Sequence, residues 1–490
     1  MTNAGGPHEN GIMPTLETSQ TRNVETDVAI IGAGTAGLAA YRAARAAGKR
    51  ALLIESGLYG TTCARVGCMP SKLLIAPAEA VHALDRFAGF GLELEGRVKV
   101  DGRAVMARVK RERDRFVGFV TRGMDAFPEA DRIRGSARFI DKTTLRIDDR
   151  LTVKTGSVVI ATGSSPAYPA AWQALGERLV TNEDVFEWDD LPESVVVFGP
   201  GVIGLELGQA LHRLGVRVKV FGRGGGVGPL SDPVLVAYAR KTFGEEFYLD
   251  TNAHAEVSSD GDQVIVKYRA LDGSTQLERF AYLLAATGRT PNLKGLGLEN
   301  TRLVLRADGV PVYDRDTLQC GDSAIFIAGD ANDDVPILHE AADEGRIAGE
   351  NAARFPDVRR GLRRALLGVV FSDPQIGIVG GGFAAIREIT HVVGTVRFED
   401  QGRARVLLRN KGLLHVYAEI GSGRFLGAEM IGPGTEHLAH LLAWALQMNL
   451  TVAQILEMPF YHPVVEEGLR TALRDAQAKL DELAATRVAA

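Results

Sequence analysis

Two segments of the chain repeat one local pattern, and this duplication limits the folds that the sequence can adopt. Residues 24–56 and 194–223 each show an apolar strand, a glycine-rich turn, a helix and a second apolar strand. In such a unit the first glycine permits the tight turn, the second lets the backbone approach a pyrophosphate, and the third lets the helix pack on the strand. The sequence therefore predicts an α/β protein with two Rossmann-like dinucleotide-binding domains. The glycines are Gly32, Gly34 and Gly37 in the first unit and Gly199, Gly201 and Gly204 in the second.

The two units differ at the end of their second strand. Glu55 lies 18 residues beyond Gly37, where it can accept a hydrogen bond from a ribose hydroxyl. The second unit ends in Gly222 and Arg223 instead. Arg223 could pair with a 2′-phosphate that a carboxylate would repel, so this site leans toward NADP over NAD, although a lone exposed arginine is also common without any ligand. Two different dinucleotides are expected, one of which can reduce the other.

Three further predicted strands end in residues that suit cofactor contacts. The runs 157–169 and 282–292 both contain Ala-Thr-Gly, which ends in Gly163 and in Gly288. The predicted strand within 324–332 ends in Gly329 and Asp330. An aspartate at the carboxyl end of a strand can bind a cofactor hydroxyl or simply cap a helix, and the sequence leaves both roles open.

Residues 61–72, TTCARVGCMPSK, hold two of the three cysteines among 490 residues. On an ideal helix Cys63 and Cys68 would be roughly 8 to 9 Å apart at Cα, beyond the roughly 4.4 to 6.8 Å that a disulfide tolerates. Gly67 permits an irregular turn between them, and Pro70 suits the first turn of a following helix. Cys68 would then lie at a helix N-terminus, where a thiolate is favoured. Taken alone, the pair is compatible with a redox dithiol, metal ligands or incidental thiols.

A second candidate group lies near the C-terminus. His462 precedes Pro463, which holds it extended, just ahead of a predicted helix with Glu466 and Glu467. A histidine oriented by a carboxylate is a common general acid–base pair. A His-Pro sequence is more often structural, but a redox dithiol elsewhere in the chain would need a base.

Composition argues against several other classes of protein. The net charge is −5 with both signs dispersed, so no nucleic-acid or membrane partner is expected, and the basic run 359–364 should be a solvated helix face. No apolar run approaches the roughly 18 residues that span a bilayer, and the first 23 residues lack a signal core. We therefore expect a cytoplasmic protein, without a metal site.

Together, these motifs resemble the flavin-dependent pyridine-nucleotide disulfide oxidoreductases of the dihydrolipoamide dehydrogenase and glutathione reductase type. The resemblance spans residues 25–480 and includes both glycine units, C-x4-C with GCMPSK, the ATG and AGD segments and HPVVEE, all in family order. It implies FAD on the first unit with Glu55 and a nicotinamide cofactor on the second. It also implies a C-terminal α+β dimerisation domain and a homodimer, in which His462 and Glu467 complete the partner subunit's site.

The same resemblance implies roles for the remaining residues. Cys63 would exchange with substrate, and Cys68 would face the isoalloxazine. Lys72 would lie near flavin N5 with Glu206 as its ion partner. Further cofactor contacts would come from Gly163 and Asp330 for FAD and from Gly288 for the nicotinamide cofactor.

The activity that the resemblance implies is like that of dihydrolipoamide dehydrogenase. Two electrons would pass between dihydrolipoamide, free or on a lipoyl carrier protein, the dithiol, FAD and NAD(P)⁺. Thr61 and Arg65 depart from the glycine and asparagine that are usual beside the cysteines, and Arg42 aligns with a glutathione-holding position. Arg42 and Arg65 are therefore possible substrate contacts. An NADPH-dependent glutathione-type reductase and a non-catalytic redox-sensing flavoprotein are the alternatives, whereas mercuric and large thioredoxin reductases are disfavoured because no cysteine pair follows Cys320.

The predicted domains follow the order of these motifs. They are a disordered tail (1–24), an FAD-binding domain with the dithiol (25–169), an NAD(P)-binding domain (170–290), the remainder of the central domain (291–368) and the dimerisation domain (369–490).

Overall fold

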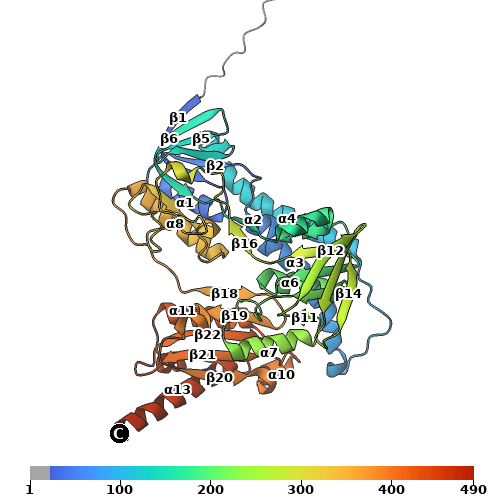
Figure 1. Cartoon of the computed structure of the whole chain (residues 1–490). Coiled ribbons are helices and arrows are strands. Elements are labelled where there is room, and N and C mark those ends of the chain that lie inside the picture. The colour runs from blue at the N-terminus through green and yellow to red at the C-terminus, as the bar shows by residue number, and fades with distance from the viewer. Residues whose placement is uncertain (1–21, 490) are drawn as a thin grey trace, which may run out of the picture.

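The computed structural model describes residues 22–489, which form three parts built on separate sheets (Figure 1). Its first strand begins inside the predicted tail. Arg22, Asn23 and Val24 belong to β1 because their backbones pair with Leu151, Thr152 and Val153 of β6. The predicted tail is therefore three residues too long, and its remainder, 1–21, lies outside the described residues.

The first part is a seven-stranded sheet with the order β3-β2-β1-β6-β5-β4, and β17 pairs with β6. The chain thus returns to this sheet after building the second part. Helices α1 and α8 lie side by side against it, and Gly345 and Gly349 of α8 contact the α1 backbone at Ala36 and Ala40 so closely that no Cβ would fit (Figure 1). The strands are β1 (Arg22–Ile31), β2 (Ala51–Glu55), β3 (Arg132–Arg134), β4 (Ala137–Asp141), β5 (Thr144–Ile147), β6 (Leu151–Ile160) and β17 (Ile325–Ile327). The helices are α1 (Thr35–Ala46) and α8 (Leu338–Arg354).

The second part repeats this design with the parallel order β11-β10-β9-β15-β8 and a three-stranded antiparallel sheet, β12-β13-β14. Gly32 and Gly199 adopt nearly the same left-handed φ, +107° and +108°. The predicted pair of Rossmann-like units is confirmed. The elements are β8 (Leu179–Val180), β9 (Ser194–Phe198), α6 (Val202–Arg213), β10 (Arg217–Phe221), α7 (Pro233–Gly244), β11 (Tyr248–Asp250), β12 (Ala255–Asp260), β13 (Gln263–Arg269), β14 (Thr275–Phe280) and β15 (Tyr282–Ala285). The two parts are linked by β7 (Ser164–Pro166) and β16 (Arg289–Pro291), which pair antiparallel.

Three helices follow the first glycine unit and lie between the two cofactor domains (Figure 1). Buried apolar side chains of α3, such as Leu74 and Ala78, pack in one core with Val197 of β9 and Leu205 of α6. Helix α3 therefore packs in the hydrophobic core of the second Rossmann-like unit, whereas the sheet of the first unit has cores of its own. The helices are α2 (Thr62–Val66), α3 (Cys68–His82) and α4 (Gly102–Asp125).

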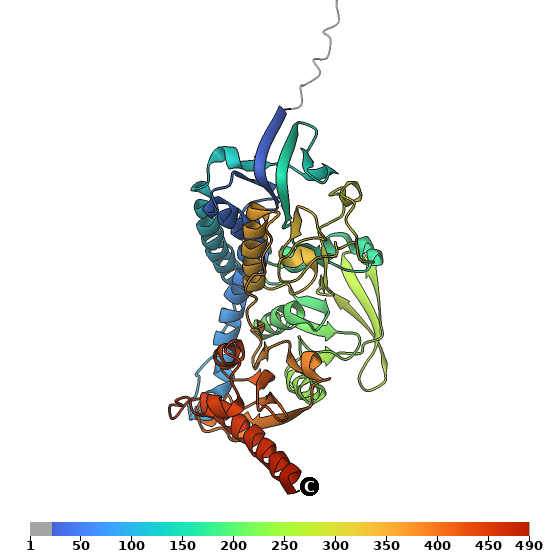
Figure 2. The same cartoon turned by 90° about the vertical axis from the view of Figure 1, so that its left-hand side faces the viewer.

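The third part is the predicted α+β domain, whose antiparallel sheet has the order β18-β19-β22-β21-β20 and packs against α11 and α13. Figures 1 and 2 both place this part at the opposite end of the molecule from β1. The elements are β18 (Leu367–Val370), β19 (Gln375–Val379), β20 (His391–Arg397), β21 (Leu413–Glu419), β22 (Phe425–Gly432), α11 (Thr435–Gln447) and α13 (Glu466–Ala489). Short helices are α5 (Asn182–Val185), α9 (Gly382–Ile386), α10 (Gly402–Val406) and α12 (Val452–Leu456).

The prediction of a solvated helix face over 359–364 is wrong about the helix and about Arg363, whereas the side chains of Arg359, Arg360 and Arg364 are exposed. These residues belong to a connector, residues 355–366, that runs from α8 to β18 without regular helix. Its Arg363 side chain is only 16% exposed because it is paired with the carboxylates of Glu340 and Glu344 on α8. None of the helices within residues 22–489 combines the length and apolarity needed to cross a membrane.

Candidate active site

The cysteine pair lies where two short helical segments meet. Helix α2 ends at Val66, Gly67 breaks the path with φ −128° and ψ −118°, and α3 begins at Cys68. The predicted position of Cys68 at a helix N-terminus is confirmed. Asn182 of the second part fixes this turn by donating to the Val66 carbonyl at 2.7 Å.

The two cysteines are free thiols that share a hydrogen bond, and their chemistry is unequal. The hydrogen bond from Cys63 lowers the pKa of Cys68 to about 7 against the effect of desolvation, and the Lys72 charge lowers it further. The pKa of Cys63 is raised, because this thiol donates the hydrogen bond and is partly buried. In the reduced pair these shifts favour a thiolate on Cys68 over one on Cys63.

Lys72 and Glu206 form an ion pair beside the dithiol. The Lys72 Nζ lies 2.9 Å and 2.8 Å from the two carboxylate oxygens of Glu206, which is 4% exposed. The Phe371 backbone N–H donates to the same carboxylate at 2.9 Å, and the ammonium lies 4.5 Å from the centre of the Phe371 ring. Residues from α3, α6 and the end of β18 thus hold one positive charge near Cys68. That this charge also lies near flavin N5 stays a prediction.

The first glycine turn has the open space that a pyrophosphate needs. A Cβ at Gly34 would meet nothing within 4 Å, whereas one at Gly37 would run into the Gly32 carbonyl. Glu55 accepts from the backbone N–H of Ala33 and of Gly57, both at 2.7 Å, so its carboxylate lies against this turn. These positions fit the pyrophosphate and ribose of a dinucleotide.

The Ala-Thr-Gly segment at 161–163 and the Gly-Asp segment at 329–330 meet next to the first glycine turn. The buried Thr162 hydroxyl has no hydrogen-bond partner within the described chain, and Gly163 adopts φ +67° with open space at its Cβ position. Asp330 accepts from the Ser164 hydroxyl at 2.7 Å, and Arg289 donates to the same hydroxyl at 2.7 Å. A partnerless buried hydroxyl and an unfilled glycine position are what a site for a bound cofactor requires, so the residues present fit FAD.

The second glycine turn has the same geometry. Space is open at the Cβ positions of Gly201 and Gly288, while a Cβ at Gly204 would meet the Gly199 carbonyl. A cavity of about 780 Å³ opens beside Arg223. Its cationic lining residues are Arg223, Lys267 and Arg269, and His254 and Glu256 also line it.

Lys267 and Arg269 were not found from the sequence. They lie two apart on β13, so they share one face of that strand, and the alternation K-Y-R was the available signal. Their position near Arg223 could not be inferred because it depends on how the three-stranded sheet packs on the second Rossmann-like unit.

His462 and Glu467 form the predicted pair. The Nδ1 atom of His462 lies 3.0 Å and 3.1 Å from the two carboxylate oxygens of Glu467, and this hydrogen bond lowers the pKa of Glu467. The imidazole is 79% exposed in the α+β domain, whereas the dithiol lies at α2 and α3 (Figures 1 and 2). Within the described residues of one protomer, the structure therefore keeps the dyad apart from the cysteines.

The α+β domain also exposes large apolar side chains. Trp444, Met448 and Tyr461 are 66%, 70% and 79% exposed, and Leu441 is 41% exposed. Exposed apolar side chains of this size on one domain suit a protein interface.

The structure also places Thr61 and Arg65, the two residues beside the cysteines that differ from the usual family sequence, and Arg42. Thr61 adopts φ +60°, a left-handed conformation that favours glycine, and its hydroxyl caps α2 by accepting from the Ala64 N–H at 3.3 Å. Arg65 donates to the Tyr59 carbonyl at 3.4 Å. Arg42 is exposed on α1, with its guanidinium 5.5 Å from the centre of the Phe127 ring.

Comparison with known proteins covers nearly the whole chain. The family described as pyridine nucleotide-disulphide oxidoreductase matches residues 26–345, and the dimerisation domain of that family matches residues 367–473. A dihydrolipoyl dehydrogenase of Haloferax volcanii is 30% identical, covering 92% of this chain and 96% of the relative. A mercuric reductase of Streptomyces lividans is 31% identical over 91% of this chain and 95% of the relative.

Solved structures show the same fold. LpdA from Mycobacterium tuberculosis is similar with a TM-score of 0.78 at 26% identity, covering 92% of this chain and 99% of that one. The flavoprotein disulfide reductase RclA from Escherichia coli has a TM-score of 0.78 at 23% identity, which supports the fold alone.

Proposed function

The chain belongs to the pyridine nucleotide-disulphide oxidoreductase family, and from that premise we propose that it is a dihydrolipoamide dehydrogenase-like enzyme whose redox dithiol is Cys63 and Cys68. Membership implies FAD and a pyridine nucleotide as cofactors, and the matched dimerisation domain supports a homodimer. The finer proposal, that the substrate is a dithiol such as dihydrolipoamide, free or on a carrier protein, is supported by the position of Cys63 and Cys68 at the start of α3, by the Lys72–Glu206 pair beside them and by the His462–Glu467 pair.

The chemistry begins from the oxidised pair. His462 of the partner subunit takes the proton from a substrate thiol, whose sulfur attacks Cys63 Sγ. The Cys63–Cys68 bond breaks, and Cys68 leaves as a thiolate, which its lowered pKa favours. The result is a mixed disulfide between Cys63 and the substrate.

The second thiol of the substrate then attacks the first substrate sulfur, which is the one bonded to Cys63 in the mixed disulfide. The Cys63–substrate bond breaks, the substrate leaves as an oxidised disulfide, and Cys63 takes a proton. Two electrons now reside on the enzyme dithiol. FAD, when bound, supplies the two-electron acceptor that connects the dithiol to the pyridine nucleotide. Lys72 keeps the Cys68 thiolate charged, and Glu467 stabilises the imidazolium of His462.

For the coenzyme we propose a preference for NADP over NAD. Arg223 lies at the end of the second unit, in a cavity whose lining adds Lys267 and Arg269. Cationic side chains that converge on one cavity suit a 2′-phosphate. Glu256 also lines the cavity and lies 3.7 Å from Lys267, which limits the expected preference.

Steady-state kinetics with dihydrolipoamide, using NAD⁺ and NADP⁺ in parallel, tests this proposal. We expect turnover with dihydrolipoamide and a higher kcat/KM with NADP⁺. Turnover of oxidised glutathione by NADPH without dihydrolipoamide activity would replace the proposal with a glutathione-type reductase, which the exposed Arg42 favours as the second candidate. If neither substrate is turned over, the remaining alternative is a non-catalytic redox-sensing flavoprotein.

A further inference from the structure

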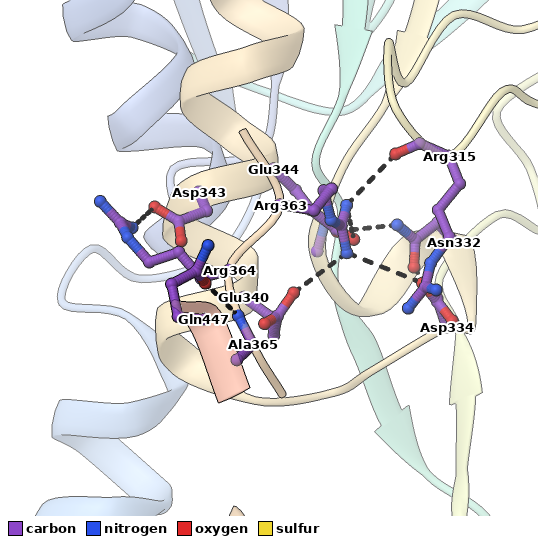
Figure 3. Close-up of polar contacts among 11 residues, drawn as sticks. Arg315, Asn332, Asp334, Glu340, Asp343, Glu344, Arg363, Arg364, Ala365 and Gln447 are labelled. Atoms are coloured by element: carbon purple, nitrogen blue, oxygen red, sulfur yellow. Dashed lines mark hydrogen bonds and ion pairs between the residues drawn. The ribbon is translucent and has the colours of Figure 1, made fainter. Parts of the chain in front are cut away.

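The connector 355–366 is bound to α8 at several points: Arg363 and Arg364 pair with carboxylates of that helix (Figure 3), and the Arg359 backbone bonds to the Asn351 side chain. Of these residues, Arg363 reaches the two most deeply buried carboxylates. The Nη1 atom of Arg363 donates to Glu344 Oε1 at 2.9 Å, and its Nη2 atom donates to Glu340 Oε2 at 3.0 Å. Glu340 and Glu344 are 2% and 1% exposed, one turn apart on α8. Arg363 therefore pairs with two buried carboxylates at once. The connector then reaches the α+β domain, where the Ala365 N–H donates to Gln447 at 2.6 Å.

The second carboxylate oxygen of Glu344 faces away from Arg363. It accepts from the Gly329 N–H at 2.8 Å and from the Asn332 side-chain amide at 2.7 Å. Gly329 and Asn332 are the first and last residues of the short turn that carries Asp330. One carboxylate thus binds both ends of this turn.

Besides the bonds to Glu344, other contacts also restrict the Gly329–Asn332 turn. Gly329 adopts φ +68°, and a side chain there would crowd Ala36 of α1 and Ala341 of α8. On its other side, Asp330 is bound to the Ser164 hydroxyl. The position of Asp330 therefore depends on packing against α1, on Ser164 and on the carboxylate of Glu344.

The carboxylate of Glu344 depends in turn on Arg363. Burial raises the pKa of Glu344, and the Arg363 charge opposes that rise. A buried charge that loses its partner is strongly destabilised, because little solvent is present to replace the lost interaction. Without Arg363, Glu344 would take up a proton, which weakens the hydrogen bonds that its second oxygen accepts from Gly329 and Asn332, or it would turn toward solvent, which breaks them.

We propose that Arg363 is a positioning residue of the flavin site: by fixing Glu344, it holds the Gly329–Asn332 turn in the conformation from which Asp330 binds FAD. This inference rests on the proposed function in one respect, the assignment of Asp330 to FAD. It extends that function by giving the connector to the α+β domain a role in cofactor retention.

The test compares Arg363→Gln with Arg360→Gln as a matched control. Both arginines lie on the connector, but Arg360 is 81% exposed, and its one ion pair within residues 22–489 is with the surface residue Asp316 at 3.6 Å. The rate of FAD release from the purified holoenzyme is measured by the recovery of flavin fluorescence. We expect release from Arg363→Gln to be about tenfold faster than from wild type, and release from Arg360→Gln to be unchanged.

A second readout separates positioning from a general loss of stability. At saturating FAD, the visible circular dichroism of the flavin should change in Arg363→Gln, because the cofactor is bound by a displaced Asp330. Arg363→Lys keeps one positive charge but not the planar fork that spans two carboxylates, so we expect an intermediate release rate. If Arg363→Gln does not fold, the FAD release rate and flavin dichroism of Arg363→Lys test the inference instead.

Equal FAD release from Arg363→Lys, Arg360→Gln and wild type would overturn the inference, as would an unchanged flavin dichroism in a variant that releases FAD faster. A wild-type protein that holds FAD but shows no dithiol turnover would contradict the proposed function and leave this inference standing. A wild-type protein that binds no FAD would contradict both.

Discussion

The dithiol and the His462–Glu467 pair are organised in opposite ways. The cysteines lie between two domains and are surrounded by fixed partners: Asn182 binds the turn between them, and Lys72 is paired with a buried glutamate. The imidazole is 79% exposed and has one carboxylate partner in its own segment. One half of the proposed site is thus complete within a chain, and the other half is presented outward.

This difference indicates how the two halves acquire their reactivity. Cys68 obtains its thiolate from groups in its own protomer, since Cys63 and Lys72 lower its pKa to about 7. Within the chain His462 obtains its orientation from Glu467, and in the proposed homodimer it would act on a substrate bound at the other subunit's dithiol. Reduction of the Cys63–Cys68 pair should therefore tolerate changes at His462 and Glu467, whereas thiol exchange with a substrate should need both the dithiol and this pair.

The strongest test of this division removes a sulfur. Cys63→Ser should lower turnover with dihydrolipoamide by more than about a thousandfold, because no disulfide can form. Cys320→Ser is the matched control. Cys320 is fully buried, and burial raises its pKa to about 12, so it should be inert and its replacement should leave kcat within about twofold. Substantial turnover by Cys63→Ser would place the chemistry elsewhere.

The second test removes the base. His462→Gln should lower thiol exchange by about a hundredfold to ten-thousandfold, since proton transfer is lost. Reduction of a quinone by NAD(P)H should remain near the wild-type rate, because that reaction does not use the dithiol. Comparing the two activities in one preparation checks this prediction, and an equal loss of both would remove His462 from its proposed role.

The third test uses pH. In the reduced protein without FAD, alkylation by iodoacetamide should rise about tenfold per pH unit below about 7 and level off above it, as Cys68 ionises. Because this pKa is depressed, the thiolate adds stability that is fully present above the ordinary thiol pKa and is lost as the pH falls through about 7. Lys72→Met should move the midpoint upward. A midpoint that does not move would show that Lys72 has no electrostatic role.

A smaller effect is expected at the orienting carboxylate. Glu467→Gln should reduce thiol exchange by about tenfold, because the amide orients the imidazole but does not stabilise its charged form. Glu466→Gln is the control from the same helical turn, since the described contacts of His462 go to Glu467. If the two variants lose activity equally, the effect belongs to the start of α13 and not to the dyad.

The sequence was informative where function depends on local geometry. The glycine spacing predicted both Rossmann-like units, and Gly67 and Pro70 predicted a helix that starts at Cys68. These features follow from backbone conformation within a few residues, which composition and spacing record directly.

Features that depend on distant partners were missed or wrong. The basic run that contains Arg363 was predicted as a solvated face, because nothing nearby in sequence shows that Glu340 and Glu344 are buried and aimed at it. Lys267 and Arg269 were missed for the same reason. Ion pairs between segments depend on packing, which hydrophobic periodicity within each segment does not determine.

Arg65 provides the last and smallest test, because it stands between the cysteines where the family usually has asparagine. In the structure it donates to the Tyr59 carbonyl, and its side chain lies against Gly60. Within residues 22–489 it has no carboxylate partner. An additional cation there should favour an acidic or carrier-borne substrate. Arg65→Asn should therefore change the ratio of kcat/KM between an anionic and a neutral dithiol by about threefold to tenfold, with kcat for the neutral one unchanged. An unchanged ratio would refute a role in substrate preference, and the departure would then be explained by packing against Gly60.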